Sequence, residues 1–126
     1  MTSNVDVCQA FFRATAGGDG DAIKSVCAPD FKGSQNGGPE MDLATLVGFA
    51  LAVKKAIPDF RYDNAVRSQT DAGFVEEHDV LGTLPDGSLF SMPVVVVADV
   101  ADGRITSMRE YFDSRAAAGL LKALSG

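Results

Sequence analysis

The chain has 126 residues, of which 46% are hydrophobic, and a formal net charge of −6. This length and apolar content fit one domain with its own core, so we expect residues 1–126 to form a single domain. The acidic balance argues against a nucleic-acid partner, and no apolar run approaches the roughly 18 residues of a membrane span. With no signal-peptide pattern at the start, we expect a cytoplasmic protein without a membrane partner.

The two cysteines and the one histidine do not form a metal-binding pattern. Cys8 and Cys27 fall in helix-like stretches without CxxC spacing, and His78 is the only histidine. A zinc site normally draws on several such ligands at short spacing. We therefore expect buried, reduced thiols, no metal and no cofactor.

The first part of the chain predicts two helices. Ser3-x-x-Asp6 resembles a capping box, and apolar residues then recur at helical spacing, which predicts a helix over about residues 4 to 16. Asp19 begins a second, short helix that should end at Pro29, since proline cannot continue it.

The segment that follows predicts a loop and a longer helix. Residues 30 to 41 are rich in Gly, Asn and Pro and are interpreted as a loop. From Met41-Asp42 to Pro58 the apolar residues keep a 3.6-residue period, which predicts a third helix. A strand over 60 to 68 and a closing helix over 114 to 124 are also expected.

Three strand-like runs joined by two glycine turns predict an antiparallel meander. The runs are Phe74 to Leu84, Ser88 to Val100 and Arg104 to Phe112, and the turns contain Pro85-Asp86-Gly87 and Ala101-Asp102-Gly103. Helices followed by strands indicate an α+β fold, in which three N-terminal helices pack on a curved, mostly antiparallel sheet. Such a sheet would form a cone-shaped α+β barrel with an apolar pocket inside.

The first turn sets which side chains of the meander face this pocket. A two-residue Asp86-Gly87 turn would pair residues whose numbers sum to 173. His78 would then lie on the opposite face, for which we expect a surface or subunit-contact role. The pocket face would carry Glu77 opposite Val96, Asp79 opposite Val94 and Leu81 opposite Met92.

The second turn allows two registers, and a one-residue slip would turn every side chain to the other face. A three-residue loop ending in Gly103 would bring Met108, Glu110 and Phe112 to the pocket face, opposite Val96, Val94 and Met92. A two-residue turn would instead present Arg109 and Tyr111. We favour the three-residue loop, because Met108 and Phe112 make the better core face.

In the favoured register Asp79 and Glu110 flank Val94 with backbones roughly 9 to 10 Å apart. In an apolar surround one of two such carboxyls should hold its proton, so that one can donate a proton while the other accepts one. The alternative interpretation is that Glu77 and Asp79 lie near an open rim and are only solvated.

Three segments resemble a known superfamily: Phe11-Phe12-Arg13-Ala14-Thr15-Ala16-Gly17-Gly18-Asp19, Ala28-Pro29-Asp30-Phe31 and Asp102-Gly103-Arg104-Ile105 continuing to Glu110-Tyr111-Phe112-Asp113. They are similar to the nuclear transport factor 2-like superfamily, in its SnoaL-like branch with polyketide cyclases, limonene-type epoxide hydrolases and, more distantly, ketosteroid isomerases. The resemblance covers nearly the whole chain. It implies a cystatin-like fold and a homodimer formed through the outer face of the sheet.

The resemblance also implies roles for single residues. In the epoxide hydrolase pattern, Asp79 and Glu110 match the two aspartates and Asn36 the asparagine, while Glu77 stands where an arginine is expected and Ser34 where a tyrosine is expected. In polyketide cyclases the acid/base aspartate falls at Glu110. The isomerase pattern fits less well.

These sequence features predict two alternative functions. The first is an acid/base enzyme without a cofactor, of the epoxide hydrolase, cyclase or isomerase type, acting on a small apolar oxygenated molecule. The second is a non-catalytic ligand-binding or dimerisation module. The predicted site comprises Glu110 and Asp79 as catalytic residues and Asn36, Glu77, Leu81, Met92, Val94, Met108 and Phe112 as ligand-binding residues.

Overall fold

The computed structural model describes residues 3–125. They form four helices and five strands, and none of these helices is long and apolar enough to cross a membrane. Their order is α1 (Asn4–Gly17), α2 (Gly20–Val26), β1 (Cys27–Gln35), α3 (Leu43–Ala56), β2 (Arg61–Gln69), β3 (Gly73–Thr83), β4 (Leu89–Ala101), β5 (Arg104–Phe112) and α4 (Ser114–Ser125).

The helices begin where the sequence predicts. The capping box at α1 is complete, because the Ser3 hydroxyl accepts from the Asp6 N–H and the Asp6 carboxylate accepts from the Ser3 N–H. Asp19 and Asp42 cap α2 and α3 in the same way, each through a side-chain oxygen that accepts a backbone N–H three residues on.

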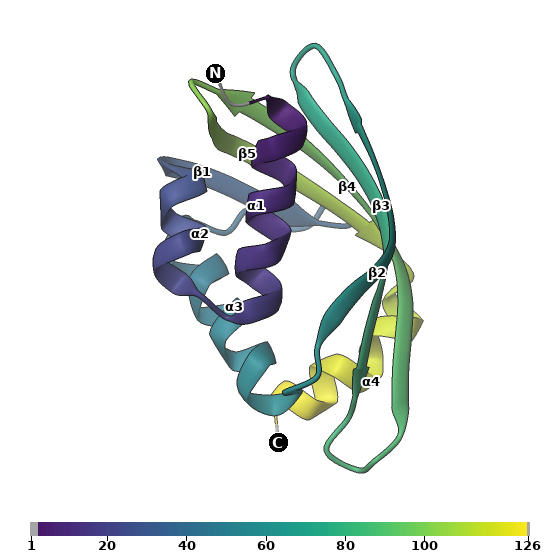
Figure 1. Cartoon of the computed structure of the whole chain (residues 1–126). Coiled ribbons are helices and arrows are strands. Elements are labelled where there is room, and N and C mark those ends of the chain that lie inside the picture. Colours follow the sequence, from purple (N-terminus) through teal and green to yellow (C-terminus); the bar gives the residue numbers. More distant parts are fainter. Residues whose placement is uncertain (1–2, 126) are drawn as a thin grey trace.

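The five strands form one curved sheet in the order β1-β5-β4-β3-β2, parallel between β1 and β5 and antiparallel elsewhere. Helices α1, α2 and α3 lie together on one side of this sheet, as Figure 1 shows, and α4 lies at the end where the β3–β4 turn projects. The core forms between the three helices and the sheet. An α+β fold is thus confirmed.

Strand β1 was not predicted. The segment 30 to 41 was expected to be a loop, but Cys27–Gln35 is a strand, so Cys27 is not helical and the three helices do not follow one another directly. The strand is paired with residues about 75 positions later in the chain, for example Gly33 with Met108. Its residues have little strand propensity, and this distant pairing stabilises the extended form.

The β3–β4 turn has three residues where two were predicted. The Leu84 N–H donates to the Ser88 carbonyl and the Gly87 N–H to the Leu84 carbonyl, so the loop is Pro85-Asp86-Gly87 with Gly87 at φ 89°. Proline suits the second position of a type I turn, and a left-handed glycine completes the three-residue hairpin. Facing residues therefore sum to 172, with His78 opposite Val94, and the predicted face of β3 is wrong throughout.

The β4–β5 turn has two residues where three were predicted. Ala101 pairs with Arg104, and Asp102 and Gly103 have φ of 54° and 75°, the pattern of a type I′ turn. A bulge follows, because Asp99 pairs with Ser107 and Val100 with Ile105, which leaves Thr106 as an extra residue. The extra residue returns the later side chains of β5 to the faces that were predicted for them. Glu110 therefore faces inward as predicted, although it lies opposite Val96 and not Val94.

Candidate functional site

A cavity of about 110 Å³ lies between the helices and the inner face of the sheet. Residues from α1, α3, α4 and all five strands line it, and most of them are apolar. This space could hold several water molecules or a small organic molecule. The polar side chains of its wall are Thr15, Gln35, Tyr62, His78 and Glu110, and the aromatic side chains include Phe11, Phe12, Phe49, Phe60 and Phe112.

His78 lies in the cavity wall, and neighbouring side chains fix the position of its ring. Its Nδ1 is 2.6 Å from Glu76 Oε2, and Phe12 and Tyr62 pack against the ring with centroid distances of 4.9 and 4.5 Å. An ionised carboxylate can only accept, so Nδ1 carries the proton. Nε2 forms no hydrogen bond within residues 3–125, which leaves it for a molecule in the cavity.

Glu76 is fully buried and is held by three donors. Oε2 accepts from His78, and Oε1 accepts from Arg67 Nε at 2.7 Å and from the Cys8 thiol at 3.4 Å. Burial by itself would raise the pKa of Glu76, but the hydrogen bonds and charges of His78 and Arg67 outweigh it and hold this pKa below its ordinary value. Glu76 is therefore an anion that fixes the His78 ring and tautomer.

Glu110 lies on β5 and lines the same cavity. Burial raises the pKa of its carboxyl, and a positive charge on the nearby His78, when that ring is protonated, opposes this only in part. A carboxyl with a raised pKa keeps its proton to higher pH and can donate it. The cavity thus presents a histidine nitrogen able to accept a proton and a carboxyl able to donate one.

Tyr62 and Thr15 form a further polar part of the cavity wall. The Tyr62 hydroxyl lies 2.9 Å from Thr15 Oγ1, which itself donates to the Phe12 carbonyl at 3.2 Å. Burial raises the pKa of the Tyr62 phenol, so the hydroxyl stays neutral. Tyr62 and Thr15 are therefore neutral hydrogen-bonding groups.

Four of the predicted site residues line the cavity: Glu110, Met92, Val94 and Phe112. Met108 is buried beside them and, with Glu110, borders a much smaller void near Phe31 and Met41 instead. These residues lie on the predicted face of the sheet, because the side chains of β4 and β5 alternate between the two faces in the predicted sense.

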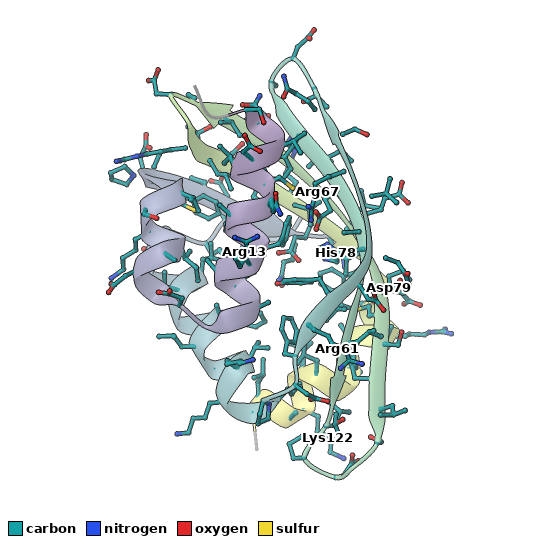
Figure 2. The ribbon with its side chains drawn as sticks, in the orientation of Figure 1. Arg13, Arg61, Arg67, His78, Asp79 and Lys122 are labelled. Carbon is teal, nitrogen blue, oxygen red and sulfur yellow. The ribbon has the colours of Figure 1, made fainter. Side chains whose placement is uncertain are left out.

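The predicted positions of Asp79, Glu77 and Leu81 in the cavity are wrong. The one-residue change in the β3–β4 turn places all three on the outer face, where Asp79 Oδ2 accepts from Asn64 Nδ2 at 2.9 Å. Figure 2 shows Asp79 on the outer side of the sheet, whereas His78 and Arg67 lie between α1 and the sheet. The expected Asp79–Glu110 pair across Val94 does not form.

Asn36 was predicted to bind the ligand, but it does not line the cavity. It follows β1 with φ 53°, and its side-chain oxygen accepts the Phe112 N–H at 2.9 Å. Ser34 and Gln35 precede it on β1, and of these only Gln35 reaches the cavity wall.

Sequence reasoning missed Glu76 and His78 as a pair. The signal was present, because residues two apart in a strand share a face, which places Phe74, Glu76, His78 and Val80 together. If Phe74 and Val80 are assigned to the core, Glu76 and His78 must face the core as well. Among the residues that the structure describes, no three His, Cys, Asp or Glu side chains gather closely enough to hold a metal ion.

Solved structures share this fold over nearly their whole length. IdmH from Streptomyces antibioticus, a "putative polyketide cyclase", matches at a TM-score of 0.80 and 21% identity, covering 98% of this chain and 99% of its own. A second "putative polyketide cyclase", from Xanthomonas campestris pv. campestris, matches at 0.79 and 23% identity, covering 89% and 91%. A hypothetical protein with a ketosteroid isomerase-like fold, from Catenulispora acidiphila, matches at 0.77 and 15% identity, covering 95% and 92%.

At these identities the similarity establishes a shared ketosteroid isomerase-like fold. Residues 8–108 match the SnoaL-like domain family, and the chain belongs to that family. The predicted SnoaL-like branch of the nuclear transport factor 2-like superfamily is thereby confirmed. No curated protein matches the chain.

Proposed function

We propose that this protein is an acid/base enzyme that moves a proton next to a carbonyl group of a small, neutral, mostly apolar molecule. The observation that carries the proposal is the arrangement of His78 and Glu110, which line one apolar cavity while Glu76 holds the far side of the imidazole. Among residues 3–125 no lysine or arginine lines this cavity, so a neutral substrate fits it better than an anionic one.

In this proposal His78 is the general base. Nε2 takes a proton from a carbon beside the carbonyl, and the imidazolium that forms is stabilised by the Glu76 carboxylate at 2.6 Å. The electron pair of the broken C–H bond moves onto the carbonyl oxygen. The Glu110 carboxyl donates a hydrogen bond or its proton to that oxygen, which gives an enolate or enol.

The enol can then be reprotonated at another carbon or attack a second carbonyl. The first outcome is an isomerisation and the second a ring closure. The two similar proteins described as putative polyketide cyclases favour the second. Epoxide hydrolysis has less support, because Asp79, which its pattern requires, lies outside the cavity.

Hydrogen exchange tests the proposal without knowledge of the natural substrate. Small 1,3-diketones and β-keto esters are incubated in D₂O, and loss of the α-hydrogen signal is followed by NMR. We expect the protein to accelerate exchange for at least one compound, and H78A and E110Q to lower that rate by roughly 10²-fold or more.

Asp79→Asn is the matched control, since it removes a carboxylate of the same sheet on the outer face. It should exchange at the wild-type rate. If no compound exchanges faster with protein, or if D79N loses as much as E110Q, the proposal is wrong. Binding of these compounds without faster exchange would favour a ligand-binding protein.

We also propose that the outer face of the sheet pairs with a second copy of the chain. The helices leave this face open, and Val66, Val95 and Tyr111 are 63%, 37% and 45% exposed there. Sedimentation or light scattering should show a dimer that V95E weakens. A monomer at micromolar concentration would contradict this.

A further inference from the structure

A chain of hydrogen bonds leads from the protein surface to His78. Arg67 on β2 is paired in register with Glu76 on β3, and His78 lies two residues further along the same face. The Arg67 side chain is 27% exposed, whereas that of Glu76 is fully buried. Each oxygen of the carboxylate therefore has a different partner: Oε1 is 2.7 Å from Arg67 Nε, and Oε2 is 2.6 Å from His78 Nδ1.

Two positive charges can compensate the buried Glu76 anion. If His78 were its sole partner, the imidazole would hold its proton to balance the carboxylate, because a buried unpaired charge is costly. A protonated imidazole cannot act as a base. Arginine remains charged at every accessible pH, so Arg67 can balance Glu76 while His78 is neutral.

The other groups around the imidazole do not supply this charge. The titratable side chains near it come from four elements: Cys8 from α1, Tyr62 and Arg67 from β2, Glu76 from β3 and Glu110 from β5. Of these, Arg67 alone is a permanent cation. Cys8 and Tyr62 are neutral donors, and Glu110 would only add negative charge.

We propose that Arg67 is a positioning residue that keeps Glu76 compensated, so that His78 retains a neutral imidazole with Nε2 free to accept a proton. This inference rests on the proposed function in that it explains how His78 serves as the base. Arg67 does not line the cavity, so it acts through Glu76 and not on the substrate.

The single histidine makes the proposal directly measurable. In protein labelled with ¹⁵N-histidine, one imidazole reports the protonation of His78 without resonance assignment. We expect Arg67→Gln to move the midpoint of this titration to higher pH, because it removes a cation that opposes imidazole protonation. Arg67→Lys retains the charge and should stay near the wild-type midpoint.

Arg61→Gln is the matched control on the same strand. Arg61 is solvent-exposed and lies 3.7 Å from Asp59, away from the Glu76 carboxylate, so its removal should leave the titration unchanged. Arg67→Met offers a second neutral variant in case a buried amide prevents R67Q from folding. A folded R67Q or R67M with the wild-type midpoint overturns the proposal.

The titration is measured without substrate, so its result is independent of turnover. A shifted midpoint together with no α-hydrogen exchange for any compound would leave the role of Arg67 intact and refute the enzyme. Exchange that depends on His78, together with an unshifted midpoint in folded R67Q, would refute the role of Arg67 alone. In an active enzyme, R67Q should also shift the acidic limb of the pH–rate profile upward by the same amount.

Discussion

Asn36 and Phe112 join the ends of two parallel strands: Asn36 Oδ1 accepts the Phe112 N–H at 2.9 Å, and the Asn36 N–H donates to the Glu110 carbonyl at 2.8 Å. Asn36 has φ 53°, a left-handed conformation that asparagine adopts more readily than most residues. Both bonds act on the end of β5, where Glu110 and Phe112 enter the cavity wall. Asn36 therefore supports the site from its backbone side.

Asn36→Ala should lower the free energy of unfolding by about 1–2 kcal/mol. The variant loses the side-chain acceptor and places an alanine in the left-handed region. Urea unfolding measures the change. Asn36→Asp keeps both the acceptor and the tolerance for this conformation, so it should lie closer to the wild type, and equal losses in the two variants would contradict the explanation.

Glu110→Gln should change how stability depends on pH. Burial raises the pKa of Glu110 in the folded state above its ordinary value of 4.5. The stability that its neutral form contributes is present below the unfolded-state pKa and is lost as pH rises through the folded-state pKa. Glutamine cannot ionise, so E110Q should become more stable relative to the wild type as pH rises from about 4.5 toward neutrality.

Thermal denaturation at a series of pH values measures this difference. Glu77→Gln is the control, because Glu77 is exposed on the outer face. Glu77→Gln should show no comparable rise in stability relative to the wild type over the same pH range. A stability difference between E110Q and wild type that stays constant with pH would show that Glu110 is not desolvated.

Gly73→Ala should destabilise the fold by about 1–3 kcal/mol. A Cβ at Gly73 would overlap the backbone carbonyl of Ala98, which the sheet holds in place. At Gly17, at the end of α1, a Cβ meets nothing within 4 Å, so Gly17→Ala should be neutral or stabilising by up to about 1 kcal/mol. Chemical denaturation compares the two, and equal effects would be inconsistent with the close approach of β3 and β4.

The two cysteines should be inert in the native protein. Burial raises the pKa of both Cys8 and Cys27 to about 12, and Glu76 adds to this at Cys8. A colourimetric thiol reagent at pH 8 should detect no thiol in folded protein and both after denaturation. Rapid labelling of the folded protein would show that the core opens around them.

Local patterns were sufficient for most elements of the fold. Caps at Ser3, Asp19 and Asp42, the 3.6-residue period of α3 and the alternation in β4 each act within a few residues, so the sequence expresses them directly. Strand β1 depends on a parallel partner far along the chain, and no local pattern reveals such a partner.

The sequence by itself determined which residues of β3 share a face, since side chains alternate in any strand. Glu76 and His78 had to lie on one side and Glu77 and Asp79 on the other. Only the tertiary structure decided which side faces the cavity, through the three-residue turn at Pro85, while a bulge at Thr106 set the facing of β5. The physical reason is that one residue in a turn inverts an entire strand, while two-residue and three-residue turns are both common and the local sequence is compatible with either.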